Sequence, residues 1–223
     1  MSRLARLASL LVMAVLAGCA TGPVRAPAAV TLSGPALAAA MAGVEAREAL
    51  LARSGPLAFN GRVALTNGAD GGNGRLEWWQ SDERFQAMLR APVTRQGWSL
   101  VAGPGGARLD GLEGGPLVGP DPGWLLQEAT GMEVPVAALA AWAAGTRADE
   151  AVHGRARLEF DADGRLVRIR QAGWTIDYVS WQAESAAPGA GPLPRRVDAE
   201  RGDARVRLVV DDWVLGAPAP GGS

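Results

Sequence analysis

Residues 57–65 read Leu57-Ala58-Phe59-Asn60-Gly61-Arg62-Val63-Ala64-Leu65. Large apolar side chains recur there with a spacing of two residues, at Leu57, Phe59, Val63 and Leu65. A β-strand places successive side chains on opposite faces, so this spacing predicts a strand with one apolar and one polar face. Such strands are typical of antiparallel sheets that pack one face and leave the other in water.

The same spacing returns along most of the chain that follows. We expect further strands at residues 75–78, 84–90, 98–102, 107–112, 156–160, 166–171, 174–181, 195–200 and 205–213. Turn residues separate them: the segment 66–74 is rich in glycine and asparagine, and Asp161-Ala162-Asp163-Gly164 reads as a hairpin turn rather than a calcium loop. The pattern predicts one antiparallel meander of about ten to eleven strands.

Three segments change to a helical pattern. Residues 35–53 form one expected helix, with Ser33 as a candidate cap and Gly55 beyond its end. Two short apolar helices are expected at 122–130 and 136–144, each with proline at its start and glycine just past its end. Since these helices are the only cover available for the apolar face, we predict a mainly β, α+β fold. The sheet is expected to be curved into an incomplete β-barrel, with a helical lid over a hydrophobic cavity.

The cavity wall should come from the apolar sides of the strands and from the apolar helices. The expected lining residues are Phe59, Val63, Leu76, Trp78, Phe85, Leu89, Trp142, Trp174, Ile176 and Tyr178. Eight tryptophans against one tyrosine and three phenylalanines suit a wide cavity with rigid walls that accepts alkyl chains. The alternative for any one of them is ordinary core packing.

The first residues are predicted to be a signal peptide, residues 1–18. Arg3 and Arg6 precede an apolar run at 7–16, which is too short to span a bilayer permanently. The run leads into Leu16-Ala17-Gly18-Cys19, which resembles the lipobox of bacterial lipoproteins and implies that Cys19 is acylated. The alternative is an ordinary signal peptide followed by a chance cysteine.

Several acyl chains on Cys19 would give a firm anchor, since each buried CH₂ contributes about 0.8 kcal/mol. Ala20 stands where an aspartate would retain such a protein in the inner membrane, which favours the outer membrane. Residues 19–33 are expected to form the lipidated start and a flexible tether, 34–216 a single domain, and 217–223 a disordered tail.

Other chemistries lack their residues in this sequence. The formal net charge of −1 provides no strongly basic face for nucleic acid. Cys19 is the only cysteine and His153 the only histidine, which excludes intramolecular disulfides and His- or Cys-cluster metal sites. The carboxylate pairs Asp82-Glu83 and Asp211-Asp212 are adjacent in sequence, so their side chains point to opposite faces of a strand. We therefore expect no enzyme, no metal and no cofactor apart from the covalent lipid.

The ordered motifs of the chain from about Phe59 to Trp213 resemble the LolB family of outer-membrane lipoprotein receptors. The motifs are Phe59-x-Gly61-Arg62-Val63, Trp78 with Gln80, Arg84-Phe85 leading to Leu89 and Pro92, Thr130-Gly131-Met132-x-Val134-Pro135 with Leu139 and Trp142-x-x-Gly145, Gln171-x-Gly173-Trp174-x-Ile176-x-Tyr178, Leu193-Pro194, and Arg205-x-Arg207-Leu208 with Trp213. The resemblance implies an incomplete barrel with a helical lid and a non-enzymatic role. It implies a receptor that binds acyl chains of lipoproteins from the periplasmic carrier LolA and inserts them into the outer membrane.

The resemblance also implies a membrane-insertion loop and a set of partners. The family loop carries a protruding leucine; here Pro92 and Val93 occupy the matching positions, with Trp98 nearby as a candidate substitute. The expected partners are a LolA-like carrier, client lipoproteins and outer-membrane lipid, with a monomeric protein anchored on the periplasmic face. Two alternatives remain: an envelope-assembly lipoprotein that docks another protein, and a cell-wall hydrolase, which the missing catalytic residues disfavour.

Overall fold

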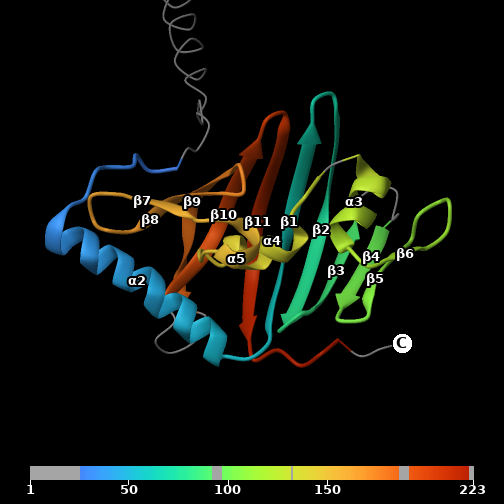
Figure 1. The fold of residues 1–223 in the computed structure, drawn as a ribbon, viewed down its shortest axis with the longest axis horizontal. Helices are drawn as coiled ribbons and strands as arrows, with labels where there is room; N and C mark the ends of the chain where they lie inside the picture. Colours follow the sequence, from blue (N-terminus) through green and yellow to red (C-terminus); the bar gives the residue numbers. More distant parts are fainter. Residues whose placement is uncertain (1–25, 92–96, 132, 186–190, 221–223) are drawn as a thin grey trace, which may run out of the picture.

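The computed structural model describes residues 26–91, 97–131, 133–185 and 191–220, with the side chains of Thr130 and Ser185 excepted. Cys19, Pro92 and Val93 lie outside these residues. Eleven strands form one antiparallel sheet in the order β6-β5-β4-β3-β2-β1-β11-β10-β9-β8-β7 (Figure 1). Their bounds are β1 Leu57–Asn67, β2 Asp70–Ser81, β3 Arg84–Arg90, β4 Gly97–Gly103, β5 Gly106–Asp110, β6 Leu117–Gly119, β7 Arg157–Phe160, β8 Leu166–Gln171, β9 Trp174–Ser185, β10 Pro192–Arg201 and β11 Ala204–Leu215.

The pairing of β1 with β11 joins the two halves of the sheet. Leu57 lies opposite Leu215 and Asn67 opposite Ala204, so the first and last strands pair along their whole length. All other neighbours in the sheet are consecutive in sequence, and β6 and β7 form its two edges. The sheet is therefore a barrel that does not close, and the predicted fold class is confirmed.

The β1–β2 hairpin is longer than the sequence pattern predicted. Segment 66–74 was expected to be a turn, but only Gly68 and Ala69 separate the strands, and Asn67 pairs with Asp70. Gly68 adopts a φ of 60°, which suits a tight hairpin turn. Backbone pairing needs no side chain, so a glycine-rich strand carries no apolar pattern from which to predict it.

Four described helices accompany the sheet, namely α2 Gly34–Arg53, α3 Pro122–Thr130, α4 Val136–Ala143 and α5 Glu150–His153. Local sequence explains α3: the Asp121 side chain accepts a hydrogen bond from Gly123 N at 2.8 Å, and Gly131 ends the helix in a left-handed conformation. Ser33 occupies the N-cap of α2 but makes no side-chain capping bond. The four-residue α5 was not predicted. None of the helices in the described part of the chain is long and apolar enough to cross a membrane.

The helices cover one face of the curved sheet. Figure 1 shows α4 and α5 over the middle of the sheet, α3 beside β4–β6, and α2 along the side of β7–β9. Most of α4 is buried, since Val136, Ala138, Ala140, Trp142 and Ala143 are at most 5% exposed. A helix that is apolar on nearly every face belongs inside a protein, and α4 packs against both apolar clusters of the core.

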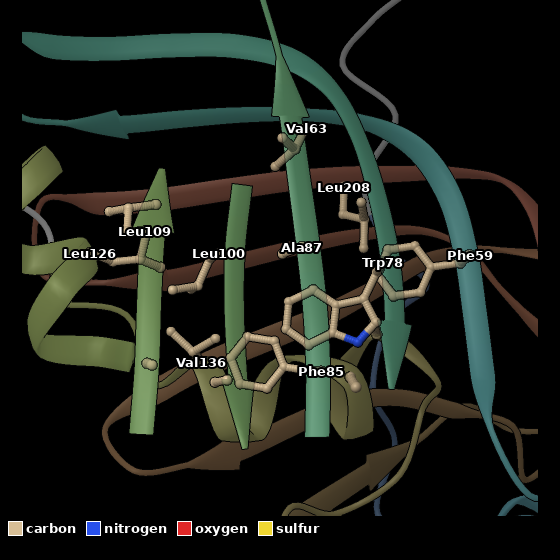
Figure 2. Close-up of a cluster of buried hydrophobic side chains, with 14 of the residues drawn as sticks. Phe59, Val63, Trp78, Phe85, Ala87, Leu100, Leu109, Leu126, Val136 and Leu208 are labelled. Atoms are coloured by element: carbon tan, nitrogen blue, oxygen red, sulfur yellow. The ribbon is translucent and has the colours of Figure 1, made fainter. Parts of the chain in front are cut away.

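A layer of aromatic rings lies on the inner face of the first strands. Trp78 stacks on Phe59 and on Phe85, with ring centroids 6.1 and 5.0 Å apart, and Phe59 also contacts Trp213 at 4.9 Å. Figure 2 shows Phe59, Trp78 and Phe85 beside Leu100 and Val136 on this face. The sequence spacing that predicted this apolar face therefore corresponds to a packed layer contributed by neighbouring strands.

The domain extends past the predicted boundary at residue 216. Gly216 N and Ala217 N donate hydrogen bonds to Pro56 O at 2.7 and 3.2 Å, and Trp79 Nε1 donates to Ala217 O at 3.1 Å. Ala217 is buried. The expected disorder from residue 217 is thus wrong for Ala217, because the start of the tail completes the packing at the beginning of β1.

Candidate functional site

A cavity of about 110 Å³ lies between the inner face of the sheet and the helices α3 and α4. Every residue of its wall is apolar. Eight of the ten predicted residues line it: Phe59, Val63, Leu76, Trp78, Leu89, Trp142, Trp174 and Ile176. The sheet contributes strands from both halves of the barrel, so the wall depends on the β1–β11 pairing.

Two predicted lining residues, Phe85 and Tyr178, are not in the wall. Phe85 stacks on Trp78 and is 6% exposed, and Tyr178 is fully buried. The Tyr178 hydroxyl donates a hydrogen bond to the Trp142 carbonyl at 2.8 Å, and burial raises the pKa of this hydroxyl. Both residues share a strand face with lining residues but lie at other positions along the strand, which the spacing alone does not reveal.

The wall also contains residues that were not among the ten predicted lining residues. They are Leu65, Ala87, Trp98, Leu100, Leu126, Val134, Val136, Leu139, Ala143, Val197, Ala199, Val206 and Leu208. The alternation in β3 and β4 could have indicated Ala87, Trp98 and Leu100. Residues from α3 and α4 depend on how the helices cross the sheet, which a sequence pattern does not specify.

Trp98, the candidate substitute for the protruding leucine of the family, belongs to β4. It pairs with Leu89 of β3 and is half-buried in the cavity wall. Pro92 and Val93, the other residues expected in the insertion loop, lie outside the described residues.

A polar network fixes α4 and α5 at one end of the cavity. Gln171 is 3% exposed and accepts hydrogen bonds from Trp142 Nε1 and Ala148 N at 2.9 and 3.0 Å. Its amide nitrogen donates to Ala148 O and Gly154 O at 2.9 and 2.8 Å. All four bonds connect β8 to the helical segment, so this end of the lid is held by directional contacts.

Helix α2 holds the same segment from the other side. Arg147 donates to both carboxylate oxygens of Glu48, at 2.8 and 2.6 Å, and Arg47 donates to Gly145 O at 3.3 Å. Burial alone would raise the pKa of Glu48, but the hydrogen bonds from Arg147 keep this pKa below its ordinary value. Arg47 also lies 4.6 Å from the centre of the Trp181 ring. The helical lid is therefore attached to both α2 and β8.

Two indoles in the cavity wall have an unused donor. Trp78 Nε1 and Trp174 Nε1 are buried without a hydrogen-bond partner in the described residues. An unpaired buried N–H costs stability, so these rings are present for their shape and apolar surface rather than for a hydrogen bond.

The side chains of Asp211 and Asp212 contact polar side chains of β1 and β2. Asp211 lies within 3.2 Å of Arg62 and 3.4 Å of Arg75, while Asp212 accepts a hydrogen bond from Asn60 at 3.4 Å. These partners are solvent-exposed. In the described residues, no group of three His, Cys, Asp or Glu side chains is placed to hold a metal ion.

Comparison with known proteins identifies the family. The family model described as outer membrane lipoprotein LolB matches residues 56–213. The outer-membrane lipoprotein LolB of Xanthomonas campestris pv. campestris (strain 8004) is 43% identical over 208 residues, covering 92% of this chain and 94% of the relative. The LolB of Xylella fastidiosa (strain Temecula1 / ATCC 700964) is 38% identical over 201 residues, covering 89% and 88%.

Among solved structures, an outer membrane lipoprotein-sorting protein domain from Vibrio parahaemolyticus matches with a TM-score of 0.42 and 10% identity, over 79% of this chain and 93% of that one. The sequence matches are far stronger and cover the sheet, the helices and the cavity. The chain therefore belongs to the LolB family of outer-membrane lipoprotein localisation factors.

Proposed function

We propose that this protein accepts lipoproteins from a LolA-like periplasmic carrier by taking their acyl chains into the cavity, and then places them in the outer membrane. The observation that carries the proposal is the wholly apolar wall of the cavity. Members of the LolB family are not known as enzymes, and a hydrophobic cavity without charged groups suits binding rather than catalysis.

The energetics of such a transfer need no nucleotide. Moving a chain from one apolar cavity to another leaves most of its burial unchanged, so a small difference in affinity sets the direction. About 1.4 kcal/mol gives a tenfold bias towards the receptor. The bilayer then offers complete burial, at about 0.8 kcal/mol for each CH₂.

The cavity has to enlarge when a chain enters. A cavity of about 150 Å³ accommodates a molecule the size of benzene, and the cavity here measures about 110 Å³. An acyl chain is several times longer than benzene. We therefore expect the apolar contacts between the sheet and α3 and α4 to separate as the guest enters.

We also propose that Cys19 carries the lipid anchor and holds the protein on the periplasmic face of the outer membrane as a monomer. The lipobox-like sequence before Cys19 supports the anchor. Residues 20–33 then connect the anchor to α2, which begins at Gly34. The proposed partners are the carrier, client lipoproteins and outer-membrane lipid.

A charge in the cavity wall tests the proposal. Val206 on β11 lines the cavity, and its neighbour Arg205 is exposed outside this wall. Val206→Glu should reduce acceptance of a client from loaded carrier at least about tenfold, because a carboxylate beside an acyl chain is desolvated without a partner. Arg205→Glu is the matched control and should transfer at the wild-type rate.

The experiment measures the transfer of a lipoprotein from the carrier to the receptor and then to outer-membrane vesicles. Sedimentation separates the vesicles from the soluble proteins. Thermal unfolding of both variants verifies that they fold. Equal acceptance by folded Val206→Glu and wild type would contradict acyl-chain binding in this cavity and would favour a role in docking another protein.

A further inference from the structure

A surface groove of about 610 Å³ lies at the end of the sheet where the β1–β2 hairpin turns. It is lined by residues of β1, β2, β3 and β4 and by the chain that follows β5. Ala91 and Gly97, the residues on either side of segment 92–96, are part of its wall. The groove therefore lies beside the end of β3 and the start of β4.

The groove and the internal cavity share three wall residues, namely Leu65, Leu89 and Trp98. Leu89 and Trp98 are directly paired across β3 and β4, and directly paired residues project from the same face of a sheet. All three side chains are half-buried. These three side chains therefore lie where the groove and the cavity meet.

We propose that acyl chains pass between the cavity and the membrane through this groove, and that Trp98 is the gate between them. The proposal rests on the acyl-chain binding proposed above and adds the route and the residue that controls it. The ligand is the acylated N-terminus of a lipoprotein, with its hydrocarbon chains inside the cavity and its peptide outside.

Two glycines lie beside Trp98, so its indole is the largest side chain at this point between the groove and the cavity. A side chain at Gly97 would clash with the Leu89 carbonyl, and one at Gly111 would clash with the Gly97 carbonyl. Both positions therefore have to be glycine, and the strands pack closely without side chains there. In the proposed route the Trp98 indole rotates to connect the groove with the cavity, while Leu65 and Leu89 stay in the wall.

The groove has both apolar and polar wall residues, which suits a ligand with hydrocarbon chains at one end and a peptide at the other. The residues shared with the cavity are apolar, whereas Asn67, Asp70, Asn73 and Glu113 also line the groove. Amide and carboxylate groups match the hydrogen-bonding peptide of a client, which has to stay in water while its chains are buried.

The alternative route lies between the helices and the sheet. It requires Leu126, Val134 and Val136 to leave their buried positions. It also requires the ion pair between Arg201 of β10 and Glu133, which precedes α4, to break; its shortest N–O distance is 2.9 Å. On the groove route the chain does not pass between the helices and the sheet, so α3 and α4 move only as far as the enlargement of the cavity requires.

The test blocks the groove without strain. Gly72 lies opposite Leu65 in the β1–β2 hairpin and lines the groove, and a Cβ added there meets no atom within 4 Å. Gly105, in the turn between β4 and β5, has equally open space but lies outside the groove. Gly72→Trp is therefore the test variant and Gly105→Trp its matched control.

The measurement uses the mature chain with Cys19→Ser and cis-parinaric acid, an intrinsically fluorescent fatty acid. Stopped-flow fluorescence gives the rate of uptake, and mixing with phosphatidylethanolamine–phosphatidylglycerol vesicles gives the rate of release. Gly72→Trp should slow both rates at least about fivefold and leave Kd within about twofold, since a barrier on the path affects entry and exit equally. Trp98→Ala should speed both rates, and Gly105→Trp should change neither.

The outcomes separate this proposal from the one on which it rests. If the wild-type chain binds the fatty acid and Gly72→Trp exchanges it at the wild-type rate, the groove is not the route, while acyl-chain binding stands. If Leu208→Ala, in the cavity wall alone, changes the uptake rate as strongly as Trp98→Ala, Trp98 is not a gate. If the folded wild-type chain binds no fatty acid, both proposals fail.

Discussion

At the scale of single residues, four of the tryptophans show two different uses of the indole donor. Trp142 Nε1 donates to Gln171 at 2.9 Å, and Trp213 Nε1 donates to Pro194 O at 2.9 Å. Trp78 and Trp174 line the cavity and leave their donors unpaired in the described residues. The first pair fixes elements to one another, and the second pair gives the cavity a rigid wall.

This division predicts different costs for the same substitution. Trp142→Phe and Trp78→Phe remove the same volume from side chains that are 3% and 4% exposed. Only Trp142→Phe also loses a hydrogen bond, and the Gln171 oxygen then keeps only Ala148 N as a donor. We expect Trp142→Phe to lower the free energy of unfolding by about 1 kcal/mol more than Trp78→Phe. Chemical denaturation measures both, and equal losses would contradict the assigned role of the Trp142 indole.

The proposed insertion loop gives a second prediction at this scale. Val93→Glu should slow release of clients into vesicles while acceptance from the carrier continues. The charged side chain loses the burial of the valine in the membrane, which contributes about 1.5 kcal/mol. That amount biases a handover step but does not anchor a protein. The matched control is Val101→Glu, at an exposed valine of β4 that is 46% accessible. Release at the wild-type rate from Val93→Glu would remove the loop from the mechanism.

At the scale of elements, the helical lid is held unevenly. The end of α4 and the start of α5 are tied to β8 through Gln171 and to α2 through the Glu48–Arg147 pair. The start of α4 contributes Val136 to the cavity wall, and Val134 just before it lines the same space. Arg201 also holds this end, through an ion pair with Glu133, but that pair is largely exposed, whereas the bonds of Gln171 to Trp142 and Ala148 are buried. This difference favours movement of the lid about its Gln171 end.

The Glu48–Arg147 pair makes lid attachment depend on pH. Burial alone would raise the pKa of Glu48, but the hydrogen bonds from Arg147 lower it in the folded protein. The contribution of the pair to stability is therefore complete above the unfolded pKa and is lost as pH falls through the folded value. Glu48→Gln should therefore be less stable than wild type at neutral pH, and the difference should shrink as pH falls from neutral through the lowered pKa of Glu48. Thermal unfolding of both proteins across this range tests the pair. A constant difference at every pH would assign the effect of the substitution to packing.

The sequence predicted most elements, and its failures have physical causes. Alternating side chains identified β1 and β3, and proline and glycine marked α3. The edge strand β6 was missed because three residues are too few to show a period, and the first half of β2 because its glycines carry no side chains. Periodicity also reports the face of a strand and not the position along it, which is why Phe85 and Tyr178 were misassigned to the cavity wall.

At the scale of the whole molecule, an open sheet and a small lid produce a cavity that is apolar throughout. The β1–β11 pairing joins the two halves of the sheet, and α4 packs against the core of both. Close packing elsewhere keeps the wall rigid, so enlargement has to come from the lid or from the gate at Trp98. The covering of the sheet by helices was predictable from the need to bury an apolar face, but the size of the remaining space was not.

The central claim is that client acyl chains occupy this cavity, and photo-crosslinking measures it most directly. A client lipoprotein carrying diazirine-labelled acyl chains is transferred from carrier to receptor, irradiated, and the modified receptor residues are identified by mass spectrometry. We predict modification of cavity residues on both sides of the space, such as Leu139 on α4 and Leu208 on β11. Modification confined to exposed residues outside the wall, such as Val101 or Val118, with the cavity residues unlabelled, would contradict the claim.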